Sequence, residues 1–199
     1  MTPAKRFLDL SAALAGLVVL SPLFALVAFL IKADDGGPVF FRQERVGFRG
    51  TLFRILKFRT MRVKGASTDK LITVGADPRV TRVGYYLRKL KIDELPQLVN
   101  VVKGEMSLVG PRPEVPYYVA MYTPAQRRVL DFTPGITDPA SIRFRDESEV
   151  LARSADPEQA YVNEIMPEKI RLNLDYKESA TFLSDLKIIL RTLRVLSQS

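Results

Sequence analysis

Residues 90–114 read LKIDELPQLVNVVKGEMSLVGPRPE, and they hold the densest group of chemically active side chains in the chain. Two adjacent acids, Asp93 and Glu94, come just before a short apolar run. Neighbouring residues on a helix point about 100° apart, so each carboxylate can face a different target. Their like charges make it costly to ionise both, unless a divalent cation or nearby arginines offset the repulsion. The alternative is that both acids only occupy the first turn of a helix, where the helix dipole favours negative charge and proline is tolerated.

A rigid turn, GPRPE, closes the same stretch at residues 110–114. Arg112 lies between two prolines, which fix φ on both sides of it, so the backbone that carries its guanidinium is stiff before any ligand arrives. A guanidinium fork held in this way suits a phosphate group. The stretch therefore predicts that a phosphorylated ligand binds beside the paired acids.

The composition narrows the chemistry. The chain has 199 residues, a formal net charge of +8, no cysteine and no histidine. This excludes disulfides, zinc–thiolate sites, an imidazole general base and a Ser-His-Asp triad. Any catalytic acid, base or nucleophile must therefore be a carboxylate, a lysine, a tyrosine or a hydroxyl group. The positive charge indicates an anionic partner, which can be nucleic acid, phospholipid or a phosphorylated small molecule.

A long apolar segment lies near the N-terminus. Residues 10–31 contain no charge, and as one straight helix these 22 residues would reach about 33 Å, close to the roughly 30 Å core of a bilayer. A transmembrane helix is the simplest interpretation. Ser21 and Pro22 argue against it, because proline removes a helical hydrogen bond and the serine hydroxyl can replace it locally. Basic residues also flank both ends. We therefore predict a helix that enters the membrane, bends at Ser21-Pro22 and returns to the same face.

The rest of the chain predicts an α/β or α+β fold, with a small antiparallel strand set surrounded by helices that lie along the membrane face. Two strands are expected within residues 38–60, joined by a turn near residues 47–50, and a period-two pattern predicts another strand at residues 141–145. Helical spacing recurs in four further segments. These are residues 83–90, 95–102, 115–130 and 181–195.

Three other segments have clear local signals. Residues 62–79 lose periodicity and are expected to form a surface loop. Asp156 followed by Pro157 is typical of a helix start. The last helical segment is basic and amphipathic, so it either packs on the core or lies in the membrane interface.

Several motifs together resemble the bacterial sugar transferase family, the monotopic phosphoglycosyl transferases that prime glycan assembly on polyprenyl phosphate. The motifs are KFRTM at residues 57–61, the run from residue 77 to residue 114, and PGIT at residues 134–137, downstream of an apolar segment with a central Ser-Pro. The resemblance covers nearly the whole chain. One departure is DPAS at residues 138–141, where many relatives continue with glycine and a following Ala-Gln. For this reason the identity of the sugar is not carried over.

The resemblance implies a ping-pong transfer of a sugar phosphate. Asp93 would attack the sugar-bearing phosphorus of a nucleotide diphosphate sugar, usually a UDP-sugar, and expel UMP. Polyprenyl phosphate, such as undecaprenyl phosphate, would then take the phosphosugar from the aspartate. A carboxylate can form such an intermediate without histidine. Glu94 is the candidate for holding Mg²⁺, with Asp93 also in the coordination sphere.

Further residues are candidates for substrate contact. Arg112 is the first candidate for a phosphate contact, and Glu114 is a candidate for orienting Arg112 or the nucleotide. For the remaining cations the alternative is a solvated surface position. These cations are Lys57, Arg59, Arg88 and Arg145.

The same resemblance implies an organisation and a location. Residues 1–35 would form a re-entrant membrane anchor, and residues 36–199 a catalytic domain at the cytoplasmic face of a bacterial inner membrane. The expected ligands are a nucleotide sugar, polyprenyl phosphate and membrane phospholipid, and no nucleic acid is expected. The expected protein partners are a second copy of the chain, in a homodimer, and downstream glycosyltransferases.

Two other classes of function stay open at this stage. A membrane-tethered binding or scaffold protein would explain the charge and the apolar segment, but it would leave the paired acids and Arg112 without a role. A conventional glycosyltransferase would release UDP, and a phosphohydrolase would cleave the nucleotide sugar with water. The leaving nucleotide and the need for polyprenyl phosphate distinguish these reactions.

Overall fold

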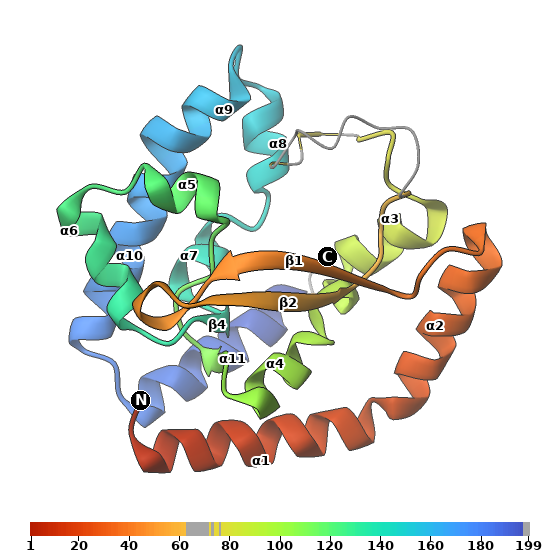
Figure 1. Ribbon diagram of the computed structural model, residues 1–199, viewed down its shortest axis with the longest axis horizontal. Helices are drawn as coiled ribbons and strands as arrows, with labels where there is room; N and C mark the ends of the chain where they lie inside the picture. Colours follow the sequence, from red (N-terminus) through yellow and green to blue (C-terminus); the bar gives the residue numbers. More distant parts are fainter. Residues whose placement is uncertain (63–71, 73, 76, 197–199) are drawn as a thin grey trace.

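A two-stranded antiparallel hairpin crosses the middle of the molecule, and helices surround it (Figure 1). The computed structural model describes residues 1–62, 72, 74–75 and 77–196, so most of the loop expected at residues 62–79 lies outside the described residues. Strand β1 (Phe40–Val46) pairs with β2 (Leu52–Phe58), from Phe40 opposite Phe58 to Val46 opposite Leu52. The turn between them contains a short helix η1 (Phe48–Gly50). The predicted mixed α/β class and the hairpin within residues 38–60 are therefore confirmed.

A second, parallel strand pair joins the two proline-rich motifs. Strand β3 (Ser107–Val109) pairs with β4 (Gly135–Thr137), which brings the GPRPE turn beside PGIT. The two backbones meet at Gly110 and Gly135, where a Cβ on Gly135 would lie 2.0 Å from the Gly110 nitrogen. No side chain fits at such a contact. The glycines thus allow the close approach that fixes the base of the Arg112 turn.

The strand predicted at residues 141–145 is wrong, because a helix, α7 (Pro139–Arg143), forms there. The Asp138 side chain accepts a hydrogen bond from the Ser141 backbone nitrogen at 3.0 Å, and Pro139 occupies the first turn of the helix. An aspartate cap followed by proline is a strong helix start. This local signal outweighs the period-two pattern of the residues that follow.

The N-terminal segment forms two helices, α1 (Pro3–Val19) and α2 (Ser21–Asp35), which are bent by 59° relative to each other. The Ser21 hydroxyl donates to the Val18 carbonyl at 2.8 Å, as the sequence predicted for the Ser-Pro break. Among the described residues no single helix is long and apolar enough to cross a bilayer. The two helices of the bent pair are long and apolar enough when they are taken together. Gly36, with φ +70°, ends α2.

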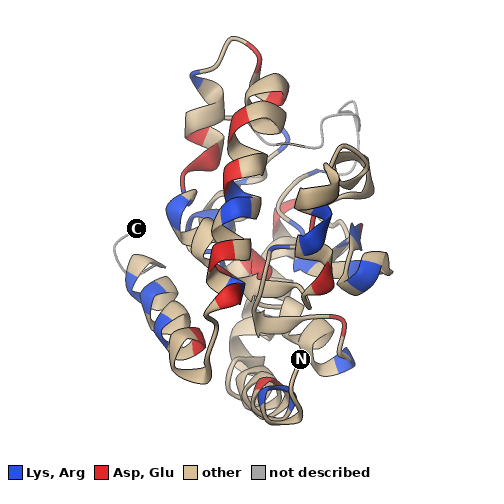
Figure 2. Ribbon diagram, turned by 90° about the vertical axis from the view of Figure 1, so that its left-hand side faces the viewer, with Lys and Arg blue, Asp and Glu red and all other residues tan. Residues whose placement is uncertain are grey.

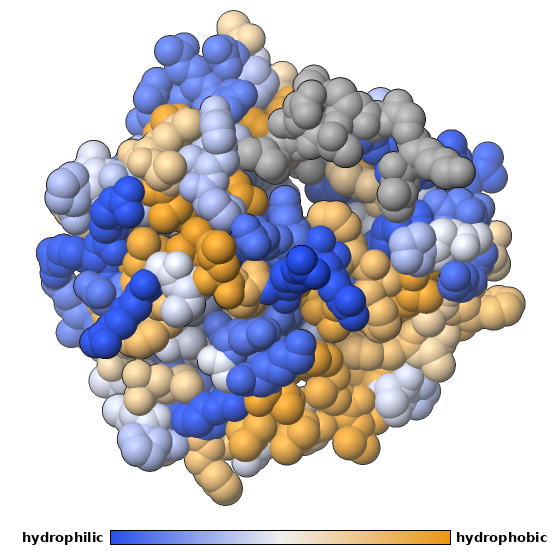
Figure 3. Space-filling view, viewed as in Figure 1, coloured by the Kyte–Doolittle hydropathy of each residue, from blue (hydrophilic) through white to orange (hydrophobic). Residues whose placement is uncertain are grey.

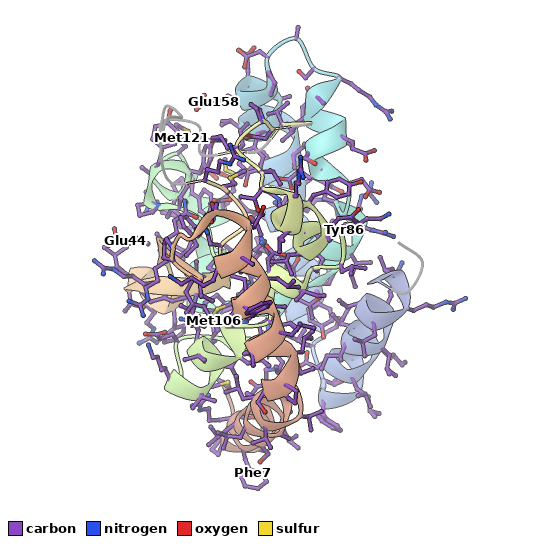
Figure 4. All side chains as sticks on the ribbon, turned by 90° about the vertical axis from the view of Figure 1, so that its right-hand side faces the viewer. Phe7, Glu44, Tyr86, Met106, Met121 and Glu158 are labelled. Atoms are coloured by element: carbon purple, nitrogen blue, oxygen red, sulfur yellow. The ribbon has the colours of Figure 1, made fainter. Side chains whose placement is uncertain are left out.

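Both ends of the bent pair are attached to the same body of the protein. Near its start, the Arg6 guanidinium donates to the carbonyls of Val101 and Val102 at 2.6 and 2.9 Å, the last turn of α4 (Gln97–Lys103). At its end, Asp35 pairs with Arg59. Side chains on the outer face remain exposed, and Figure 4 shows Phe7 pointing away from the body. Both ends of the bent pair are thus held by contacts with the rest of the chain.

The remaining helices confirm most of the predicted spacing. Helix α3 (Arg82–Lys89) and α4 form as expected. The helix predicted at residues 115–130 is instead three short pieces, because Pro116 and Pro124 each begin a new helix. These pieces are α5 (Pro116–Ala120), α6 (Pro124–Arg127) and η3 (Arg128–Asp131).

The C-terminal third is helical. Asp156 caps α9 through the Gln159 backbone nitrogen, as predicted. The helices are α8 (Glu147–Ala152), α9 (Pro157–Ala160), the π-helix η4 (Tyr161–Ile165), α10 (Met166–Glu178) and α11 (Phe182–Leu196). Figure 2 shows α11 at one side of the molecule with its lysines and arginines. Asp185 and Ile188 turn inward, and Lys5 contacts Asp185 at 2.5 Å. Its other apolar face stays exposed, so α11 both packs on the core and presents an apolar surface.

Candidate functional site

A cavity of about 1540 Å³ opens between the hairpin, the Arg112 turn and the C-terminal helices. It is lined by every predicted catalytic and substrate-binding residue except Arg59. Those residues are Lys57, Arg88, Asp93, Glu94, Arg112, Glu114 and Arg145. The structure therefore collects in one place side chains that are spread over nearly half of the chain.

Glu94 is the centre of a charged cluster in this cavity. It ends the short helix η2 (Ile92–Glu94), where the Lys57 ammonium lies 2.9 Å from Glu94 Oε1 and Arg112 Nη1 lies 3.0 Å from Glu94 Oε2. Burial alone would raise the pKa of Glu94, but the charges of Arg112 and Lys57 outweigh it and hold that pKa well below its usual range. Glu94 is thus ionised, each of its oxygens accepts a hydrogen bond, and it orients both Lys57 and Arg112.

Asp93 differs from its neighbour in both contacts and pKa. It is 8% exposed, and its Oδ1 atom is buried with no hydrogen-bond partner among the described residues. Burial, together with the negative charge of Glu94, raises the pKa of Asp93 to about 6, although Lys57 lowers it in part. A carboxylate with a shifted pKa and an unpaired oxygen in a cavity is typical of a reactive group. The two adjacent acids therefore lie in different environments.

The donor set also fits a magnesium ion in part. No cluster of three acidic metal ligands exists among the described residues. Mg²⁺ is usually held by only one or two carboxylates together with substrate phosphates, however. Asp93 Oδ1 is an oxygen ligand without a competing partner, whereas both oxygens of Glu94 already accept hydrogen bonds. Asp93 would be the better-placed metal ligand of the predicted pair, although Glu94 Oε2, which accepts one hydrogen bond from Arg112, keeps a lone pair for a cation.

Glu114 does not contact Arg112 in the described structure. Its Oε1 atom accepts from Arg45 Nη1 at 3.2 Å and from the Val115 backbone nitrogen at 2.8 Å, and its other oxygen accepts from the Tyr161 hydroxyl. Arg45 also donates to the Pro113 carbonyl at 3.2 Å. Glu114 and Arg45 therefore secure the turn that carries Arg112, and they connect it to η4.

The other predicted cations lie in different surroundings. Arg88 and Arg145 line the cavity, and Arg145 donates to the Val195 carbonyl at 3.1 Å. Arg59 does not line it: its guanidinium is 4% exposed, pairs with Asp35 and donates to the Pro38 carbonyl at 2.6 Å. The phosphate contact predicted for Arg59 has no support in this geometry, because its donors face the end of α2.

The sequence did not indicate five polar residues near the site. Gln97 is fully buried one helical turn after Asp93, and neither atom of its amide has a partner among the described residues. The other four line the cavity. They are Arg45, Tyr161, Lys169 and Asn173. The only signal for Gln97 was its i+4 spacing from Asp93, and the others lie far away in sequence without a motif.

The comparisons with known proteins identify the family. The chain belongs to the bacterial sugar transferase family, whose sequence pattern matches residues 1–199. This confirms the resemblance drawn from the KFRTM, GPRPE and PGIT motifs.

Curated relatives cover almost the whole chain. It is 37% identical over 203 residues to "Galactosyl transferase CpsE" of Streptococcus agalactiae, covering 96% of this chain but 42% of the relative. It is 37% identical to "Exopolysaccharide production protein ExoY" of Sinorhizobium fredii, covering 96% of this chain and 84% of the relative. It is 40% identical to "UDP-glucose:undecaprenyl-phosphate glucose-1-phosphate transferase" of Caulobacter vibrioides, covering 94% and 67%. The chain thus spans from under half to most of the length of these relatives.

Proposed function

We propose that the protein transfers a sugar 1-phosphate from a UDP-sugar to a polyprenyl phosphate, such as undecaprenyl phosphate, and releases UMP. The names of relatives from Caulobacter vibrioides and Escherichia coli support the reaction class. The observation that carries the proposal is the buried, unpaired oxygen of Asp93 beside a Glu94 that holds Arg112 and Lys57. Such a step would prime the assembly of a membrane-associated glycan.

The reaction has two displacements at one phosphorus. In the first, an Asp93 oxygen attacks the phosphorus that bears the sugar, and the bond from this phosphorus to the bridging oxygen breaks. UMP leaves with that oxygen and its electron pair. In the second, an oxygen of polyprenyl phosphate attacks the same phosphorus and the bond to Asp93 breaks, which restores the carboxylate. A ping-pong sequence follows, because the two substrates react in turn with one nucleophile.

The surrounding residues act by position and charge. Arg112 has more N–H donors than the two that Glu94 accepts, so it can bind phosphate oxygens while Glu94 holds its orientation. Lys57 contributes a second positive charge at the same carboxylate. Bound Mg²⁺, held by Asp93 and substrate phosphate oxygens with Glu94 as a second candidate ligand, would neutralise further negative charge.

The membrane surface would bring the lipid substrate to this cavity. Figure 3 shows apolar residues gathered at the lower right of the molecule, where α1 and α2 lie in Figure 1. Exposed apolar residues on these helices include Phe7, Val19 and Phe29. Both arms would dip into the cytoplasmic face of the bacterial inner membrane, with flanking Lys and Arg each contributing on the order of 1 kcal/mol at an anionic surface.

The nucleotide that leaves tests the proposed function. Detergent-purified protein is given Mg²⁺, undecaprenyl phosphate and a panel of UDP-sugars, and Asp93→Asn is assayed alongside. Release of UMP by the parent protein and none by the variant is expected. Release of UDP would instead indicate a conventional glycosyltransferase. Release of UMP without polyprenyl phosphate, at the full rate, would indicate hydrolysis.

A further inference from the structure

A second group of buried and partly buried polar side chains lines the cavity and makes no contact with Glu94 in the described structure. We name it the Arg45 lobe. It contains Arg45 from β1, Glu114 from the proline-rich turn, Glu147 from α8, Tyr161 from η4, and Lys169 and Asn173 from α10. None of these residues has a direct part in the two proposed displacements at phosphorus, although Glu114 and Arg45 secure the turn that carries Arg112.

Five of the six side chains of the lobe form a connected network. Glu114 accepts hydrogen bonds from Arg45 and Tyr161. The Lys169 ammonium donates to Glu147 Oε2 at 2.7 Å and lies 5.3 Å from the centre of the Tyr161 ring. Asn173 follows Lys169 by one turn of α10. The lobe is therefore held in shape by its own contacts before a ligand binds.

Two atoms in this network have no partner. Arg45 Nε and Asn173 Oδ1 are buried and have no hydrogen-bond partner among the described residues, and Asn173 is only 5% exposed. Leaving a donor or an acceptor buried without a partner is costly, so such atoms in a ligand cavity indicate that a ligand supplies the partner. A ligand group that pairs with both atoms must accept a hydrogen bond from Arg45 Nε and donate one to Asn173 Oδ1.

The charge of the lobe and the geometry of its aromatic rings restrict the chemical class of the ligand further. Arg45 and Lys169 are matched by two carboxylates, so the lobe carries no net formal charge and, unlike the Arg112 cluster, does not favour a phosphate. Lys169 lies over the Tyr161 ring, and the Tyr118 ring packs 4.9 Å from it. The aromatic face is thus occupied and does not offer a surface for stacking a nucleobase. Sugar hydroxyls, which both donate and accept, fit this lobe better.

The lobe also borders the reacting groups. Arg45 Nη1 donates to the carbonyl of Pro113, the residue directly after Arg112, at 3.2 Å, and both arginines line the same cavity. A donor with its phosphates at Arg112 can therefore reach the lobe with the group attached next to them. We propose that the Arg45 lobe binds the sugar of the donor and determines which sugar is accepted; this inference rests on the proposed function.

The test compares two lobe variants with a matched surface control on the same helix. Asn173→Leu and Lys169→Met remove polar groups from the lobe, whereas Arg171→Met changes an exposed cation whose partners are Glu168 and Asp175. Michaelis constants for UMP release are measured with UDP-sugars that differ at one hydroxyl, and the dissociation constant of UMP is measured separately. We expect the lobe variants to raise KM for the preferred donor by about tenfold or more and to change the ratio between epimeric sugars. Their affinity for UMP, which lacks the donor sugar, should stay within about twofold of the parent on the same reasoning.

Each other outcome overturns the inference. An equal loss of affinity for UMP and for the UDP-sugar would place the nucleoside in the lobe. Kinetics like those of Arg171→Met would show that the lobe does not contact the donor. Lys169→Met gives the same test if Asn173→Leu does not fold, because the Lys169 side chain is less buried. If the parent protein releases no UMP from any donor, the proposed function fails first, and that result is distinct from both.

Discussion

Two arginine–carboxylate pairs, Arg112 with Glu94 and Arg59 with Asp35, look alike in their contacts but differ in their surroundings. Arg59 lies within KFRTM and Arg112 within GPRPE. Each guanidinium makes two hydrogen bonds to its carboxylate. Arg112 lies in the cavity next to the unpaired oxygen of Asp93, whereas Arg59 closes the end of α2 against the hairpin. A buried ion pair is therefore not by itself the sign of a site. What marks the Arg112 pair is the second acid beside it, whose Oδ1 atom has no hydrogen-bond partner among the described residues.

The largest expected difference between the two pairs is in catalysis. Arg112→Lys keeps the charge but loses the planar fork, so kcat/KM for UMP release should fall about 100-fold or more. Arg59→Lys is the matched control, and its kcat/KM should stay within about threefold, because its donors face α2 rather than the cavity. Similar losses in both variants would contradict the distinction between the pairs.

The second difference is in stability. Arg59→Met leaves the Asp35 carboxylate without its guanidinium partner and should lower the free energy of unfolding by about 2 kcal/mol, less than for a fully buried pair because Asp35 is partly exposed. Thermal unfolding in detergent measures this loss, and turnover is measured per folded molecule. Full stability with reduced turnover would move Arg59 from the structural to the catalytic group.

Asp93 should affect stability in the opposite direction. Burial raises its pKa to about 6, so the folded protein holds this proton more tightly than the unfolded chain, where an aspartate titrates near pH 4. Ionising Asp93 therefore costs folding free energy that grows as pH rises from about 4 to about 6 and is fully present above that. In a chelator, Asp93→Asn should unfold at a higher temperature than the parent at pH 7.5, with the gain shrinking toward pH 4.5. A variant less stable than the parent at pH 7.5 would contradict the costly burial of the Asp93 carboxylate.

These predictions also show how far the sequence could lead. Asp93, Glu94 and Arg112 could be found because their signals are local: two adjacent acids, and an arginine between prolines. The helix start at Asp138-Pro139 is an equally local signal. The alternation of polar and apolar residues after it nevertheless predicts a strand, which the structure does not form. Arg59 and Arg112 could not be separated, because which acid reaches which arginine depends on tertiary packing. Apart from Glu114, the Arg45 lobe could not be found, since its members come from β1, α8, η4 and α10 and meet only in the fold.

An ion pair also holds the other end of the proposed membrane segment, as Arg59–Asp35 holds its end near residue 35. Substitutions near these two ends are expected to change activity least. Lys5 near the start of α1 pairs with Asp185 on α11 at 2.5 Å, so both ends are tied to one body. The chain has no cysteine, so single variants Ala4→Cys and Ala33→Cys can be labelled cleanly in cells. We expect both to react only with reagents that reach the cytoplasm and to keep full activity. Labelling of one position from each side would exclude the hairpin.

The central claim is that Asp93 is the nucleophile and Glu94 organises the cations around it, and a trapped intermediate tests it most directly. The protein is incubated with its UDP-sugar and Mg²⁺ without polyprenyl phosphate, and the intact mass and peptide masses are measured. We expect a mass increase of one sugar phosphate on the peptide that contains Asp93, its loss on addition of undecaprenyl phosphate, and no adduct in Asp93→Asn. An adduct on another residue, or UMP release that requires both substrates together with no adduct at any time, would contradict the account.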